Sequence, residues 1–232
     1  MSLGILIRLL RARLLSPIRN ARNGNAKRIV RTRAAPYVPA MTFNDRSTLL
    51  SHLKTRRSGK PRDMVAPGPS DAEIDDMIAI AARTPDHGKL SPWRFVVIPR
   101  DRRAAFAALL RGAYADENPD ATEPQLEACD RFAQEGQALI VVLSSPVESH
   151  IPLWEQRMST GAATMNLLHA AHAMGYVASW LTGWAAFSPR VRDAFGSADE
   201  AIAGFVYIGS PGRPLDERPR PDLARVRTVW AG

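Results

Sequence analysis

Residues 138–143 read Ala-Leu-Ile-Val-Val-Leu. A strand with one solvent-facing side alternates apolar and polar residues, whereas this run is apolar at every position. We therefore predict a strand at the centre of a sheet, covered on both faces. After a polar loop, residues 154–174 are rich in Ala and Gly and carry little charge beyond Arg157. This segment predicts the longest helix, buried on most sides and ended by Gly175.

Strands and helices alternate on both sides of this central pair. Short β-branched and aromatic runs predict further strands at 93–98, 176–181 and 205–208. Apolar periodicity and capping residues predict helices at 44–55, 70–81, 102–114 and 125–134, with a short helix opened by Ser188-Pro189 and closed by Gly196.

Two segments carry clear local signals. The helix at 70–81 begins with Ser70-Asp71-Ala72-Glu73, the pattern of a capping box. The tail from Ser210 contains many Pro and Arg residues and few core formers. We expect this tail to lie along a surface and to reach a second subunit.

The net charge of +8 is concentrated at the front of the chain. Residues 1–40 hold nine Lys or Arg and no acid, so the remaining chain, with 22 basic and 23 acidic residues, is nearly neutral. We predict a basic, disordered extension at 1–40, one domain at 41–232, and no nucleic-acid partner. Alternatives for the front are an interfacial amphipathic helix at Leu3–Leu15 and translation that starts at Met41.

Cysteine use and hydropathy bear on the location of the protein. The single cysteine, Cys129, cannot form an internal disulfide, which favours a reducing cytoplasm. No run approaches the roughly twenty apolar residues of a membrane span, so we predict no stable membrane association. His169 and His172 are three residues apart, but no third ligand joins them at metal-binding spacing, and we predict no metal site.

Strands separated by helices usually indicate a doubly wound parallel sheet. The sequence nevertheless contains no GxGxxG, no GxxxxGK[ST] and no GxSxG. A Rossmann site, a P-loop and a hydrolase nucleophile elbow therefore have no support.

Four local groups remain. They are Arg56-Arg57-Ser58; Arg83-Thr84-Pro85-Asp86-His87 followed by Ser91-Pro92-Trp93; Trp154-Glu155-Gln156; and Gly175 leading to Trp180-Leu181-Thr182. Their order and spacing resemble the FMN-dependent nitroreductase family, particularly its YdjA-like branch, over about 49–209. The resemblance implies an α+β fold of three α/β/α layers, with a central, mixed but mostly antiparallel sheet, and a homodimer.

The same resemblance implies an oxidoreductase that holds FMN at the dimer interface. NADH or NADPH would reduce the flavin, and nitroaromatic, quinone or similar small acceptors would reoxidise it in a ping-pong cycle. Because the cofactor carries the hard chemistry, we predict no indispensable catalytic side chain.

By resemblance, Arg56, Arg57 and Ser58 bind the FMN phosphate. Two guanidinium forks and a hydroxyl suit this role, because they give bidentate, charge-assisted hydrogen bonds. The alternative is an exposed basic helix end that complements the helix dipole.

Arg83 and His87 are also FMN contacts by resemblance, since a cation stabilises the negative charge of reduced flavin. The alternatives are a helix cap for Arg83 and a turn-stabilising role for His87. Asp86 could orient His87 or serve only the turn. Many family members have Gln where this chain has the shorter Ser91, so that contact is not predicted here.

Two further stretches complete the expected site. Trp180, Leu181 and Thr182 would hold the edge of the flavin ring by resemblance, or else Trp180 and Leu181 are strand core. Leu181 stands where the branch often has Arg, which predicts a less polar pocket or a different second substrate. Ala170, Ala171, His172, Ala173, Met174 and Gly175 correspond to the stretch assigned to NAD(P) binding. Small residues equally allow a close partner helix.

Three other functions stay open from the sequence. A family offshoot could use reduced flavin for dehalogenation or flavin breakdown. A non-catalytic flavin-binding module would bind FMN that NAD(P)H does not bleach. A nucleic-acid-binding protein rests on residues 1–40 alone, and their deletion should abolish any such affinity.

Overall fold

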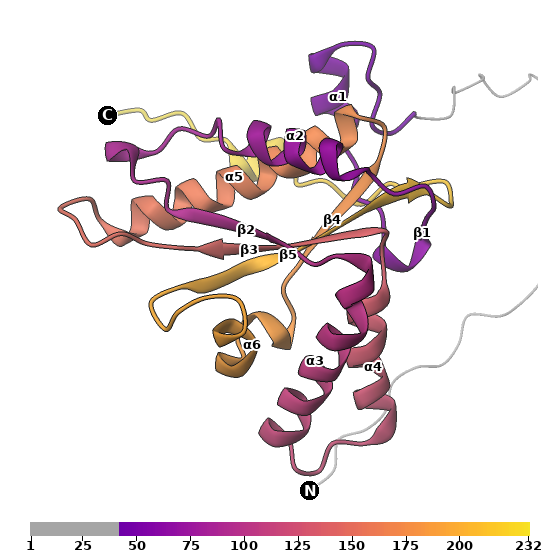
Figure 1. Cartoon of the computed structure of the whole chain (residues 1–232). Coiled ribbons are helices and arrows are strands. Elements are labelled where there is room, and N and C mark those ends of the chain that lie inside the picture. Colours follow the sequence, from indigo (N-terminus) through magenta and orange to yellow (C-terminus); the bar gives the residue numbers. More distant parts are fainter. Residues whose placement is uncertain (1–41) are drawn as a thin grey trace, which may run out of the picture. The chain divides into compact units, whose positions relative to one another are not determined.

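The computed structural model describes residues 42–232 (Figure 1). The basic extension predicted at 1–40 lies outside the described residues, and the domain boundary at 41 stays a prediction. Five strands form the sheet: β1 Met64–Val65, β2 Trp93–Val97, β3 Ala138–Ser144, β4 Val177–Leu181 and β5 Ala201–Pro211. All pairings among these strands are antiparallel. β5 pairs with β3 and β4, β2 joins β3, and β1 joins the end of β5.

A bulge in the β3–β5 pairing shapes the sheet near β4. The register shifts between Val142 and Leu143, opposite Gly204. The indole Nε1 of Trp180 donates a hydrogen bond to the carbonyl of Ala203 at 2.9 Å. A Cβ at Gly204 would overlap this indole, so the missing side chain allows Trp180 to lie over the bulge.

Seven helices surround the sheet in the described part of the chain: α1 Leu49–Thr55, α2 Asp71–Ala81, α3 Arg103–Glu117, α4 Glu123–Gln134, α5 Leu153–Ala173, α6 Pro189–Asp193 and α7 Leu223–Val226. The predicted capping box is formed, because Ser70 and Glu73 exchange backbone-to-side-chain hydrogen bonds. Gly175 follows the end of α5 with a φ of 98°. None of these helices is long and apolar enough to span a membrane.

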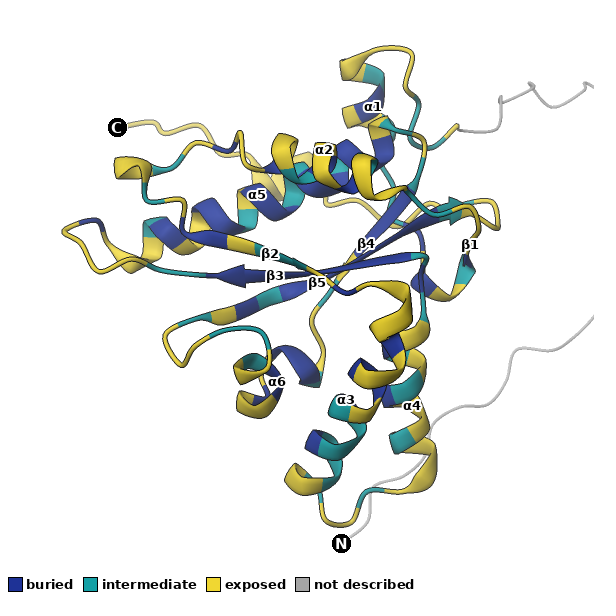
Figure 2. Ribbon diagram, viewed as in Figure 1, coloured by how far each residue is buried: buried dark blue, intermediate teal, exposed yellow. Residues whose placement is uncertain are grey.

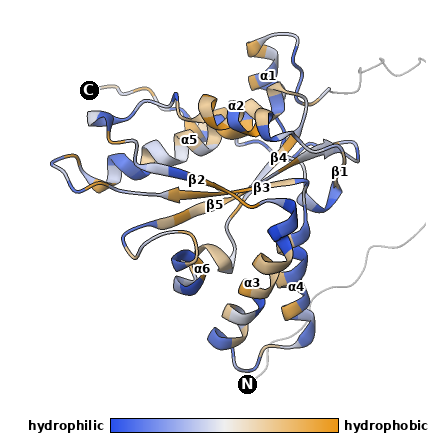
Figure 3. Ribbon diagram, in the orientation of Figure 1, coloured by the Kyte–Doolittle hydropathy of each residue, from blue (hydrophilic) through white to orange (hydrophobic). Residues whose placement is uncertain are grey.

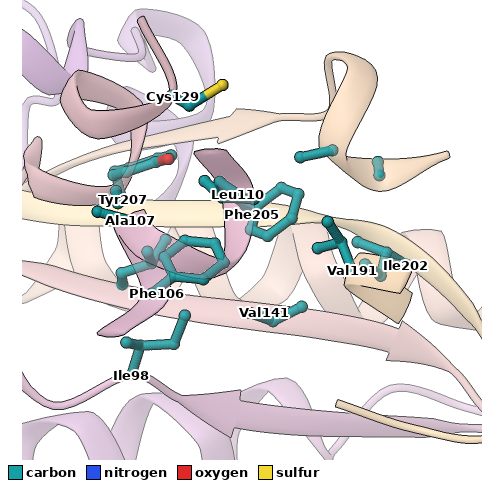
Figure 4. Close-up of a cluster of buried hydrophobic side chains, with 14 of the residues drawn as sticks. Ile98, Phe106, Ala107, Leu110, Cys129, Val141, Val191, Ile202, Phe205 and Tyr207 are labelled. Carbon is teal, nitrogen blue, oxygen red and sulfur yellow. The ribbon is translucent and has the colours of Figure 1, made fainter. Parts of the chain in front are cut away.

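The helices form layers on the two faces of the sheet (Figure 2). All residues of β3 are buried. Leu139, Val141 and Leu143 face the layer of α3, α4 and α6, whereas Ile140 and Val142 face α2 and α5. Figure 4 shows the first of these cores, where Phe106 and Leu110 of α3 lie near Val141 and Phe205. The predicted central strand and the three-layer α+β fold are confirmed.

Two features differ from the sequence expectations. The first helix begins at Leu49 rather than at residue 44, because the side chain of Thr48 caps it by accepting from the Ser51 amide. Its leucines face outward, with Leu49 76% and Leu50 60% exposed. The hydrophobic colour on α1 in Figure 3 therefore belongs partly to uncovered side chains.

Strand β1 was not predicted, because two residues are too few to show a period. It pairs with Ser210 and Pro211, so the start of the tail belongs to the sheet.

Candidate functional site

The predicted phosphate turn, 56–58, is held between an N-terminal loop and the sheet. The side chain of Asn44 donates to the Arg57 carbonyl at 3.0 Å and accepts from the Arg57 amide at 2.8 Å. Gly59 then packs on β4, where an added Cβ would lie 2.9 Å from Cγ2 of Val177. The absence of a side chain at residue 59 therefore lets the turn approach β4.

Arginines from the C-terminal tail gather at this turn. Nε of Arg57 donates to the Asp216 carbonyl at 2.7 Å, and Nη2 of Arg220 donates to the Arg56 carbonyl at 3.4 Å. Burial lowers the pKa of Arg56, and the charges of Arg220, Arg57 and Arg218 lower it further. Four guanidinium groups thus lie together, and such a cluster favours a bound anion.

Sequence reasoning missed Arg218 and Arg220, because their segment showed only the composition of a surface tail. The one signal was the run Arg-Pro-Arg-Pro at 218–221, which has no meaning until the tail is placed beside the turn. Glu217 forms an ion pair with Arg220 at 3.0 Å, and both side chains are nearly half exposed. Exposed pairs of this kind are weak, so Glu217 leaves most of the positive charge uncompensated.

A cavity of about 250 Å³ opens beside the turn. Its wall consists of residues 57–61, Asp63, three residues of β4 (Val177, Ser179 and Leu181) and the tail at 211–216. The structure therefore brings Arg57, Ser58 and Leu181 to one cavity, whereas Arg56 does not line it. Trp180 does not line this cavity, because successive residues of a strand point to opposite faces. Thr182 follows the strand and is exposed.

The stretch 170–175 divides between core and surface. Ala170 and Ala171 are buried in the layer shared with α2, as helix packing would require. His172 is fully buried, and its Nε2 accepts from the Ala178 amide at 3.2 Å. Burial, with smaller contributions from Arg56 and two neighbouring histidines, lowers the pKa of His172 to about 3, so it is uncharged at neutral pH.

Ala173 and Gly175 are exposed, and Met174 is half-buried. Gly175 and His172 line a second cavity, of about 540 Å³, together with residues 43, 44 and 46 and the tail at 211–215. His172 and Gly175 therefore border a space under the tail, whereas Ala170 and Ala173 line a cavity beside α1, and none of these four residues lines the cavity beside the turn.

A histidine pair fixes α1 to the long helix α5. His52 is the buried residue of α1, and its Nε2 lies 3.1 Å from Nδ1 of His169. Burial lowers the pKa of both histidines. A third cavity, of about 500 Å³, lies beside them and is lined by Leu49, Leu53, Ile80 and alanines of α5. Across residues 42–232, no group of three His, Cys, Asp or Glu side chains is arranged to hold a metal ion.

The Arg83–His87 segment runs along α5, from Asn166, whose Nδ2 donates to the Thr84 hydroxyl at 2.7 Å, to the first turn, where His87 meets Glu155. Nδ1 of His87 is 2.9 Å from Oε2 of Glu155, and the Ser159 hydroxyl donates to the Pro85 carbonyl at 2.8 Å. Asp86 does not orient His87, because its carboxylate accepts from the Ser91 amide at 2.9 Å. The turn role of Asp86 is the correct alternative.

Within one chain, His87 lies far from the arginine turn. Glu155, which contacts His87, is in the first turn of α5. His172, whose pKa is lowered by the nearby charge of Arg56, is in the last turn. At 1.5 Å per residue these positions are roughly 25 Å apart along the helix. Figure 1 shows α1 near one end of α5 and the loop before β2 near the other.

Comparison with known proteins places this fold and these motifs in context. A family model described as the nitroreductase family matches residues 53–210. A protein of Escherichia coli K12, provisionally named NAD(P)H nitroreductase YdjA, is 34% identical over 70% of this chain and 87% of its own length.

Two crystal structures share the fold. A nitroreductase-like family protein from Bacillus cereus superposes with a TM-score of 0.67 at 20% identity, covering 78% of this chain and 94% of its own. A provisionally named nitroreductase from Desulfovibrio desulfuricans, in complex with FMN, gives 0.61 at 22% identity, covering 78% and 95%.

Proposed function

The chain belongs to the nitroreductase family, and from this premise we propose that it uses FMN to pass electrons from NADH or NADPH to small organic acceptors such as nitroaromatics or quinones. The observation that carries the proposal is the arginine cluster at residues 56–58, which lies beside a cavity walled by β4. When bound, FMN supplies a two-electron carrier that the nicotinamide reduces and the acceptor reoxidises.

The arginine turn would hold the FMN phosphate. Arg56, Arg57 and the Ser58 hydroxyl supply charge-assisted donors, and Arg218 and Arg220 of the tail add two cations to the same place. A phosphate dianion would relieve the mutual repulsion of these guanidinium groups. Their chemistry therefore fits the phosphate end of the cofactor.

The rest of the cofactor needs more space than the cavity beside the turn provides. The cavity of about 250 Å³ is smaller than the roughly 300–1,000 Å³ of typical small-molecule sites. Leu181 would supply an apolar wall, and the backbone at 180–182 would supply polar groups for the ring edge. His87 lies too far along α5 to reach this cavity from the same chain.

We therefore propose a homodimer in which each FMN site joins the arginine turn of one subunit to Arg83 and His87 of the partner subunit. The exposed leucines of α1 and the exposed side chains of Trp154 and Met158 on α5 support this proposal, because a monomer would leave them in water. Arg83 would then place a positive charge near the reduced ring and stabilise it.

The remaining assignments concern the electron donor, the compartment and other partners. Of the stretch 170–175, the exposed Ala173 and Gly175 are the members that we propose contact NAD(P)H. The lone buried Cys129 supports a reducing compartment, which we take to be the cytoplasm. We propose no nucleic-acid partner and no stable membrane association.

The first test is the visible spectrum of the purified full chain before and after anaerobic NADPH and NADH. We expect bound FMN that both or one of these donors bleaches, and reoxidation by a nitroaromatic or a quinone. Protein that is colourless and takes up no FMN in excess would overturn the proposal. Bound FMN that neither donor bleaches would leave only a flavin-binding module.

Subunit mixing tests the shared site. Arg56→Ala with Arg57→Ala should weaken FMN binding by roughly tenfold or more, because charge-assisted hydrogen bonds are lost. The matched control, Arg102→Ala with Arg131→Ala, removes two exposed arginines elsewhere. Refolding the double variant together with His87→Ala should restore one intact site per mixed dimer. If the mixture binds no more FMN than the two variants do separately, the two halves do not come from different subunits.

A further inference from the structure

Glu155, the middle residue of the motif Trp154-Glu155-Gln156, has no role in the function proposed above. It nevertheless makes a specific contact, since Oε2 of Glu155 lies 2.9 Å from Nδ1 of His87, and 68 residues of chain separate the two. Figure 3 shows that the first turns of α5, where Glu155 lies, are more hydrophilic than its last turns. Polar residues therefore occupy the part of α5 that carries the His87 loop.

The backbone on both sides of His87 is fixed by other residues of α5. The hydroxyl of Ser159 donates to the Pro85 carbonyl at 2.8 Å, and the hydroxyl of Thr160 donates to the Pro92 carbonyl at 2.9 Å. Asn166 Nδ2 donates to the Thr84 hydroxyl at 2.7 Å. These hydrogen bonds anchor the loop without Glu155. The contact of Glu155 is therefore not needed to hold the loop, and it acts on the imidazole ring of His87.

We propose that Glu155 is a positioning residue that holds His87 in the Nδ1–H tautomer, so that Nε2 is the nitrogen offered to a ligand. An ionised carboxylate can only accept a hydrogen bond, so Nδ1 must carry the proton. Nε2 then accepts when the ring is neutral and donates when it is protonated. The inference that this ligand is the flavin of a shared site rests on the proposed function.

Other groups near the ring do not compete for Nδ1. His150 meets the ring of His87 edge-on, with centroids 6.4 Å apart, which is beyond hydrogen-bond distance. The carboxylate of Asp86 is engaged by the Ser91 amide. The His87 side chain is 61% exposed, so Nε2 stays accessible to a ligand. The side chain of free histidine favours the Nε2–H tautomer, so the proposed state reverses the intrinsic preference.

Nitrogen-15 NMR of the histidine rings in the full chain, with and without added FMN, tests the tautomer directly. We expect the Nδ1–H form for His87 in the wild type, a return to Nε2–H in Glu155→Ala, and a mixture in Glu155→Gln, whose amide can accept or donate. Ser159→Ala is the matched control, because it removes a loop anchor without touching the ring, and its His87 should keep the wild-type tautomer. An Nε2–H wild type, or Glu155 variants with unchanged signals, would overturn the proposal.

A double-mutant cycle on FMN affinity then tests whether Glu155 acts through His87. We expect Glu155→Ala to weaken FMN binding, and to have no further effect in the His87→Ala background. An equal loss in both backgrounds would show that Glu155 acts by another route and would overturn the positioning role. If His87→Ala leaves FMN binding unchanged while the tautomer shift is present, the flavin contact of the proposed function fails and the hold of Glu155 on His87 stands.

Discussion

Arg94 in β2 donates two hydrogen bonds to the carboxylate of Glu200, from Nε at 2.7 Å and from Nη2 at 3.0 Å. The Ser197 amide also donates to this carboxylate at 2.8 Å, and the Ser145 hydroxyl bonds its other oxygen. The hydrogen bond from Arg94 is the main reason that the pKa of Glu200 falls to about 2. One carboxylate thus ties an edge strand to the end of β3 and to the loop before β5.

The Glu200 carboxylate should make stability depend on pH. Its folded-state pKa is depressed, so its contribution is present above the unfolded-state pKa and is lost as pH falls from about 4.5 toward 2. Glu200→Gln should lower the free energy of unfolding by about 1 kcal/mol at pH 7, since the half-exposed Arg94 is screened by water. Urea denaturation at pH 7 and pH 3 measures the change.

The matched control is Glu127→Gln, which removes an exposed carboxylate paired with Arg131 on α4. This substitution should change the free energy of unfolding by almost nothing at pH 7 and at pH 3. A Glu200→Gln penalty that stays constant between pH 7 and pH 3 would contradict the assignment.

Arg103 is fully buried and neutralises no acid; instead it donates to carbonyls of Ile98, Ala133 and Glu135 at 2.8 to 3.3 Å. Burial lowers its pKa to about 10, so it is still charged at neutral pH. The guanidinium therefore joins the end of β2 and the end of α4 to the first turn of α3.

Replacing Arg103 should be costly, because three carbonyls lose a charged donor inside the protein. We expect Arg103→Met to lower the free energy of unfolding by about 2–4 kcal/mol. Arg102→Met, next to it and exposed, should change stability by less than about 0.5 kcal/mol. Equal chemical-denaturation midpoints for the two variants would show that the carbonyl contacts contribute little.

Local sequence patterns predicted most helices and strands. The features that they did not predict depend on contacts between residues far apart in the sequence. The run at 138–143 revealed β3 because burial on both faces demands an apolar residue at each position, and Ser70 with Glu73 revealed the start of α2 because a cap is local. No local pattern marks Arg103 as buried, since its carbonyl partners, Ile98, Ala133 and Glu135, are outside its own helix. The turn at 56–58 was identifiable from its motif, but Arg218 and Arg220 reach it only because β5 returns the chain to that place.

Gly59 tests whether the position of the arginine turn matters for cofactor binding. An alanine Cβ would press on Val177 at 2.9 Å and push the turn away from β4. Gly59→Ala should therefore reduce the free energy of FMN binding by more than it reduces the free energy of unfolding. Adding Val177→Gly removes both Cγ2, at 2.9 Å, and Cβ, at 3.0 Å, and should restore part of the FMN affinity, measured by fluorescence titration. Failure of the second substitution to restore any affinity would show that the clash is not the cause.

The tail arginines should strengthen phosphate binding through charge. Arg218 and Arg220 place two cations near Arg56, and one of them also bonds its carbonyl. If both face the FMN phosphate, Arg218→Ala with Arg220→Ala should weaken FMN binding on the order of tenfold, equivalent to about 1.4 kcal/mol. The plot of log affinity against log salt should also become less steep, because screening at 0.1 M salt acts over about 10 Å and fewer charges remain to be screened.

The same tail supplies the matched control, since Arg225→Ala with Arg227→Ala removes equal charge from exposed positions around α7. A general attraction between a basic tail and an anion would make the two pairs of substitutions equivalent, because it depends only on net charge. A local site predicts that the first pair of substitutions weakens FMN binding at 0.15 M salt and that the second pair has almost no effect on it. At this salt concentration charges farther away than about 8 Å are largely screened. Equal losses from both pairs would therefore remove Arg218 and Arg220 from the phosphate site and leave the turn at 56–58 to bind it alone.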